Sequence, residues 1–91
     1  MDPATDLAVV VAVASALLDK PVDFHTVVLG EVGLSAEVRS VSQLMVRLNE
    51  AQKLGFKRCI LPKNNLKSKD IKTKTLELIA VTGVREALDA L

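Results

Sequence analysis

The stretch SVSQLMVRLNEAQKLGFKRCILP, residues 40–62, predicts a helix followed at once by a buried strand. Ser40 and Gln43 have the spacing of a capping box at the start of this helix, and Gly55 is placed to end it in a left-handed conformation. The apolar run 56–61 then predicts a strand that stops at a proline. Apolar residues recur at helical spacing along one stripe of the helix: Val41, Leu44, Met45, Leu48, Ala51 and Leu54.

The same patterns extend outward in both directions from this unit. The other expected elements are a helix 3–19, a strand 26–29, a hairpin 31–39 that turns at 34–36, a polar basic segment 63–75, a strand 76–81 and a helix from Thr82 to Leu91. The first helix is apolar on nearly every side, which predicts burial on most of its surface. Helix and strand alternate after Ser40, which indicates a parallel βαβ unit. We therefore predict one α+β domain over residues 1–91, with a mixed sheet packed by three helices.

The composition excludes several classes of protein. A hydrophobic content of 49% in 91 residues favours a folded chain over a disordered one. The apolar run from Leu7 to Leu18 is shorter than the roughly 20 residues of a membrane-spanning helix. Cys59 is the single cysteine. It excludes an internal disulfide, and its place in an apolar strand favours packing over catalysis.

No cofactor or metal site is indicated. The glycines do not form a Gly-Lys-Ser/Thr phosphate loop, so ATP binding by this chain is not expected. His25, the sole histidine, stands two residues from Asp23, and this pair lacks the further ligands that zinc needs.

Three blocks resemble the proteolytic domain of the Lon protease family. Asp2-Pro3-Ala4-Thr5-Asp6-Leu7-Ala8 resembles the nucleophile segment Asp-Gly-Pro-Ser-Ala-Gly, and the runs at 30–34 and 54–62 resemble a hairpin block and a helix-to-strand block. The resemblance places Ala4 where the family has its serine and Met45 where it has its lysine. In that family the serine stands at a helix start, and a neutral lysine removes its proton. This chain lacks both groups, and Thr5 is a poor substitute nucleophile because no base faces it.

Within that superfamily the blocks most resemble the C-terminal Lon-like domain of the RadA (Sms) family of bacterial DNA repair proteins. The resemblance implies that residues 1–91 are the C-terminal half of a longer domain, with further strands upstream. It also implies a hexameric ring, an ATPase in a separate RecA-like domain, and a location in the bacterial cytoplasm or in a plastid. If the upstream strands are missing, we expect one sheet edge to be covered by a second copy of the chain.

Charge is distributed unevenly along the chain. Residues 51–75 hold eight basic residues against Asp70 alone, a net charge of +7, whereas the rest of the chain carries −6. These eight are the candidate DNA-contacting residues: Lys53, Lys57, Arg58, Lys63, Lys67, Lys69, Lys72 and Lys74. Lysine predominates, which suits contact with the DNA backbone and not the reading of bases. The alternative is a solvated segment whose lysines only keep the protein soluble.

Three functions remain to be distinguished on the sequence. The first is a non-catalytic Lon-like module of a repair protein that supports an oligomer and contacts DNA. The second is a purely structural oligomerisation module. The third, disfavoured by Ala4 and Met45, is a Lon-type serine peptidase.

Overall fold

A computed structural model describes residues 3–19, 21–22, 25–67, 73 and 75–91. Its elements follow in this order: η1 Pro3–Thr5, α1 Asp6–Leu17, β1 Thr26–Val28, β2 Glu31–Val32, β3 Val38–Arg39, α2 Leu44–Lys53, β4 Arg58–Pro62, η2 Lys63–Lys67, β5 Glu77–Val81 and α3 Val84–Asp89. The expected α+β class is confirmed. Its strands form a three-stranded parallel sheet and a separate antiparallel pair, β2–β3.

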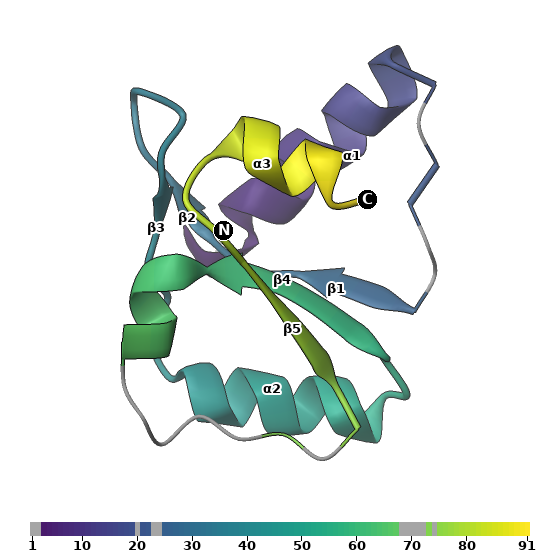
Figure 1. The fold of residues 1–91 in the computed structure, drawn as a ribbon, viewed down its shortest axis with the longest axis vertical. Coiled ribbons are helices and arrows are strands. Elements are labelled where there is room, and N and C mark those ends of the chain that lie inside the picture. Colours follow the sequence, from purple (N-terminus) through teal and green to yellow (C-terminus); the bar gives the residue numbers. More distant parts are fainter. Residues whose placement is uncertain (1–2, 20, 23–24, 68–72, 74) are drawn as a thin grey trace.

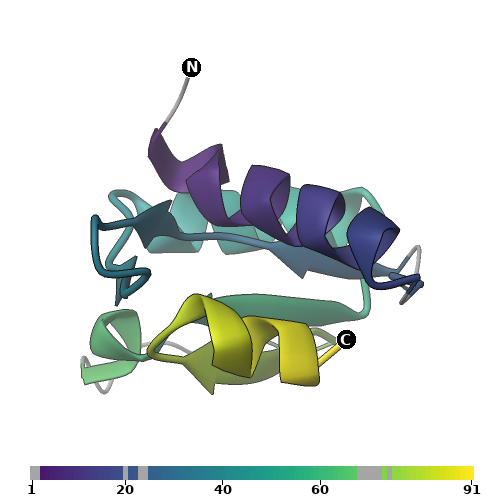
Figure 2. The ribbon, with the colours of Figure 1, turned by 90° about the horizontal axis from the view of Figure 1, so that it is seen from above.

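The parallel sheet is the centre of the fold and has the order β1-β4-β5. Val27 pairs with Cys59, and Cys59 pairs in turn with Leu78. The chain returns from β1 to β4 through α2, so the predicted βαβ unit is confirmed. Helix α2 covers one face of the sheet, and α1 and α3 lie together on the other (Figures 1 and 2).

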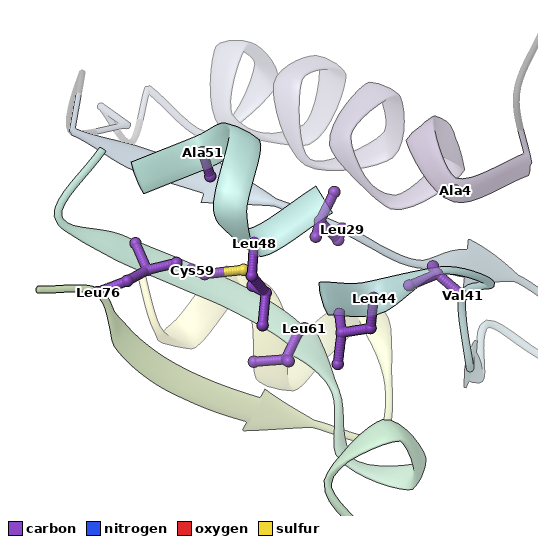
Figure 3. Close-up of a cluster of buried hydrophobic side chains, with 9 residues drawn as sticks. All are labelled: Ala4, Leu29, Val41, Leu44, Leu48, Ala51, Cys59, Leu61 and Leu76. Atoms are coloured by element: carbon purple, nitrogen blue, oxygen red, sulfur yellow. The ribbon is translucent and has the colours of Figure 1, made fainter. Parts of the chain in front are cut away.

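Alternate residues of β4 supply two hydrophobic cores. Cys59 and Leu61 face α2, whereas Ile60 faces α1 and α3, and all three are fully buried. Figure 3 shows the first core, in which Leu44 and Leu48 of α2 meet Cys59 and Leu61. A strand buried on both faces reads as a continuous apolar run, which explains why the sequence around residue 60 showed no alternation.

The predicted start of α2 is wrong. The helix begins at Leu44, and Gln43 precedes it with a left-handed φ of 54° and no side-chain capping bond. Ser40 therefore does not cap the helix, and Val41 reaches the core from the connecting loop. The predicted end is confirmed, because Gly55 has a φ of +90° and open space around it.

Two apolar residues of the predicted stripe are also misplaced. Met45 is 37% exposed and Leu54 is 69% exposed, whereas Leu48 is fully buried. The buried face of α2 is thus narrower than the sequence pattern, because Met45 is turned about 100° round the helix from buried Leu44 and Leu54 follows the last helical residue.

The outer helices also differ from expectation. The first turn of the N-terminal helix is the 3-10 turn η1, and α1 ends at Leu17. Its outer side is exposed, with Val13 at 57% and Leu17 at 82%, so burial on most sides is not observed. Helix α3 has Gly83 at its N-cap, and Thr82 instead donates its backbone N–H to Glu86 Oε1 at 2.7 Å.

The β2–β3 hairpin turns where the sequence predicts it. Gly33 N–H donates to Glu37 O at 2.9 Å, and Ala36 adopts a left-handed φ of 62°. Val38 N–H donates to Thr82 O at 2.9 Å, which ties the hairpin to the end of β5. The hairpin therefore projects from the end of the sheet where β5 and β4 finish (Figure 1).

Candidate functional site

Position 4, where the resemblance to the Lon family places the nucleophile, is part of the packed core. Ala4 lies in η1 with 4% of its surface exposed, in one cluster with Leu29, Val41 and Leu44. Its carbonyl oxygen accepts a hydrogen bond from Gly30 N–H at 2.9 Å. A methyl group fills this place, so a side chain there meets apolar neighbours and not solvent.

Position 45, where the same resemblance places the lysine base, is partly exposed at the surface. Met45 lies in the first turn of α2 and belongs to neither hydrophobic cluster. A group at this position is hydrated, and hydration stabilises the charged form of an amine. The environment of position 45 thus opposes the neutral amine that proton abstraction needs.

Thr5 and His25 are the other two residues that the sequence raised as possible reactive or metal-binding groups. Thr5 is half-buried beside an apolar groove of about 510 Å³ between α1 and β1. His25 accepts hydrogen bonds from the N–H groups of Lys57 and Arg58 through its carbonyl oxygen, and Asp23 lies outside the described residues.

No group of three or more potential metal ligands occurs in the part of the chain that the structure describes. Across the same residues, no helix has both the length and the apolar character to cross a membrane.

Cys59 is a core residue, as the sequence predicts. It has no exposed surface, and burial raises the pKa of its thiol to about 12 from the usual 9.0. A thiol that stays protonated is a poor nucleophile.

We expect the buried thiol of Cys59 to make the stability of the chain fall at alkaline pH. Its unfolded thiol ionises near pH 9 and its folded thiol near pH 12. Above pH 9 the unfolded state therefore binds fewer protons, and the contribution of this group to stability falls as the pH rises from 9 towards 12. Urea unfolding at pH 8 and pH 10, compared for the unaltered chain and Cys59→Ala, measures this effect. A pH dependence unchanged by the substitution would contradict it.

The exposed lysines lie at both ends of β4. Lys53 ends α2 and Lys57 follows it, so both lie near the start of β4, whereas Lys63 follows the end of that strand. All three are exposed. The structure thus brings together Lys53 and Lys57 at one end and Lys63 with η2 at the other. Lys67 belongs to η2, and Lys69, Lys72 and Lys74 lie outside the described residues.

Arg58 differs from these lysines. It is half-buried at the start of β4, and its guanidinium donates to Ala90 O at 2.9 Å. The side chain thereby ties the sheet to the residue after α3. Its first role is structural, and its contact with DNA stays a prediction.

The sequence predicts a turn at Asn64 and Asn65, with contact to phosphate as the less favoured alternative, and it misses the structural role of Asn65. Its Oδ1 accepts from Val41 N–H at 2.9 Å, and its Nδ2 donates to Val41 O at 3.0 Å. Asn65 and Val41 are 24 positions apart in the sequence, so no local sequence pattern could have predicted this contact.

Most of the sequence matches a model of a known protein family. Residues 2–65 match the family model described as "Subunit ChlI of Mg-chelatase". The matched part extends from the start of the chain to Asn65 in η2.

Individual relatives match almost the whole chain. A protein named "DNA repair protein RadA" from Halalkalibacterium halodurans is 47% identical over 97% of this chain and 19% of its own length. The protein of that name from Bacillus subtilis is 48% identical over 96% of this chain and 19% of its own. The protein of that name from Streptococcus pneumoniae is 44% identical over 96% of this chain and 20% of its own length. The chain spans about a fifth of the length of these curated relatives.

Proposed function

Because this chain belongs to the ChlI family and is homologous over nearly its whole length to bacterial proteins named DNA repair protein RadA, we propose that it is a non-catalytic Lon-like module of a RadA-type repair protein. The module supports an oligomer and contacts the DNA backbone. Identity to the repair proteins continues past residue 65, where the family model ends, so these relatives are the better guide to function. ATP-dependent DNA recombination by the parent protein belongs to a domain outside residues 1–91.

The burial of Ala4 is the observation that carries the non-catalytic part. A peptidase needs a nucleophile that substrate can reach, and position 4 is 4% exposed among apolar side chains. Position 45 lies at the surface, where an amine would keep its proton. The fold therefore supports a scaffold better than a hydrolytic site.

We expect that restoring the two protease residues will not restore proteolysis. In Ala4→Ser with Met45→Lys, the serine hydroxyl enters an apolar cluster and the lysine is hydrated and charged. Burying an unpaired hydroxyl costs about 1–3 kcal/mol, so the variant is also less stable. Casein or fluorogenic-peptide turnover measures the first effect and urea unfolding the second. Turnover that depends on the new serine would overturn the non-catalytic assignment.

Support for DNA contact comes from the exposed Lys53, Lys57 and Lys63 and from the +7 charge of residues 51–75. Each lysine that neutralises a phosphate releases a counterion, which steepens the dependence of binding on salt by about 0.9 in a log–log plot. Fluorescence anisotropy of duplex and branched DNA at two salt concentrations tests this part. Absence of binding at low salt would remove it.

The second candidate is an oligomerisation module without DNA binding, and the edge of β1 favours it. His25 O and Leu29 N bond to β4, so Thr26 and Val28 direct their backbone polar groups away from that strand. The buried Thr26 Oγ1 has no hydrogen-bond partner among the described residues, and the apolar groove lies beside it.

A second copy that pairs antiparallel through β1 would meet the outward backbone groups of Thr26 and Val28 in a symmetric contact. The bacterial cytoplasm or a plastid is the proposed setting. Sedimentation of the chain with and without DNA separates the two candidates, because a defined oligomer that ignores DNA supports the structural module alone.

A further inference from the structure

We infer that Asn65 is the residue that positions the basic turn η2 for contact with the DNA backbone, an inference that rests on the DNA-contact role proposed above. Both backbone polar groups of Val41 are occupied by this one carboxamide, at 2.9 and 3.0 Å. Asn65 is thus a clamp between η2 and the loop that enters α2. Figure 1 shows η2 beside the start of α2.

The chemistry of the clamp requires a carboxamide. A backbone N–H and C=O on the same residue need one acceptor and one donor side by side, and the amide of asparagine offers both. An aspartate only accepts, and alanine or serine cannot bridge both groups. The carboxamide therefore substitutes for a neighbouring strand at a place where the chain between β3 and α2 has none.

The clamp has a rigid base. Val41 is 7% exposed and belongs to the core cluster of Leu44, Leu48 and Leu61. Leu66, the next residue after Asn65, packs against the same cluster. A polar and an apolar contact from adjacent residues thus attach η2 to the core.

The attachment of η2 to the core also holds the exposed first residues of η2 in place. Lys63 opens η2 with its side chain exposed, and Asn64 is exposed next to it. An ordered turn presents Lys63 to a phosphate without a further loss of backbone conformational entropy on binding, whereas the backbone of an untied turn must be ordered by the DNA. Loss of the clamp therefore weakens binding without removing a charge.

The test uses Asn65→Ala in the 91-residue chain, with Asn64→Ala as the matched control. We expect the Val41 amide proton to exchange with solvent roughly tenfold faster in Asn65→Ala, because its acceptor is gone. Exchange at the Leu48 amide reports opening of α2 as a whole and should stay unchanged. Asn65→Ser, which removes the bridge but keeps a polar group, provides a second variant if alanine prevents folding.

The same variants are then titrated with duplex DNA. We expect about tenfold weaker binding in Asn65→Ala with the salt slope of the unaltered chain, and unaltered binding in Asn64→Ala. Unchanged Val41 exchange would overturn the clamp, and unchanged DNA affinity after faster exchange would overturn its positioning role. Failure of the unaltered chain to bind DNA would overturn the proposed function, while Val41 exchange would still decide the clamp.

Discussion

Replacing Lys53, Lys57 and Lys63 together with glutamine is expected to weaken binding to duplex DNA by roughly a hundredfold at low salt. The three ammonium groups are exposed and lie on the α2–β4–η2 segment. If each contacts one phosphate, their loss makes the log–log salt slope shallower by about 2.7. Glutamine is somewhat shorter than lysine but is polar and flexible, so charge is the main property that changes. Anisotropy at four or more salt concentrations measures both quantities.

Arg85→Gln is the matched control for this experiment. Its side chain is 90% exposed and lies on α3, which covers the face of the sheet opposite α2. It pairs with Asp89 at 3.6 Å, a surface ion pair that contributes little to stability. The control should bind DNA nearly as the unaltered chain does. Because Arg85→Gln removes one charge, a loss as large as that of a single lysine substitution would mean that net charge alone attracts the DNA.

Single substitutions resolve which end of the sheet meets the DNA. Lys53 and Lys57 lie near the start of β4, and Lys63 follows its end, so the two groups are separated by the length of that strand. A slope change confined to Lys63→Gln would assign the contact to η2. That result would agree with the clamp formed by Asn65.

The sequence predicted those parts of the fold that depend on local patterns. The strand after α2, the Gly55 helix end and the β2–β3 turn arise from neighbouring residues and are confirmed. The bounds of that strand differ, because β4 spans Arg58–Pro62 and so starts two residues later than predicted and includes the proline. The start of α2 was missed because a contact from distant Asn65 holds Val41 in the loop, which overrides the capping signal of Ser40.

The candidate site was predictable to a smaller extent. The sequence identified Ala4 and Met45, but not that one is buried in the core and the other exposed. It grouped eight basic residues by their order in the chain. Among those that the structure describes, Lys53 and Lys57 lie near the start of β4 and Lys63 follows its end, while the guanidinium of Arg58 donates to Ala90 O. The places of these basic side chains in the fold follow from tertiary contacts, which the local composition of the sequence does not reveal.

Leu48→Ala is expected to lower the free energy of unfolding by about 3 kcal/mol. Leu48 is fully buried where α2 meets the sheet, in one cluster with Cys59 and Leu61 (Figure 3). Removal of its side chain leaves a cavity that the surrounding β4 residues can fill only in part. A domain of this size has about 5–14 kcal/mol of stability, so the loss is a large share of the total. Urea unfolding should show a lower midpoint with an unchanged m-value.

Leu54→Ala makes the same chemical change at the end of the same helix, where the side chain is 69% exposed, and should alter stability by less than about 0.5 kcal/mol. Alanine is the better helix former, so neither loss can be ascribed to helix propensity. The contrast between the two variants tests which side of α2 faces β4. The burial of Ala4 also depends on this packing, because Ala4 belongs to the same cluster as Leu48. Equal losses at both positions would show that α2 packs on a different face. The scaffold assignment would then lose its structural basis.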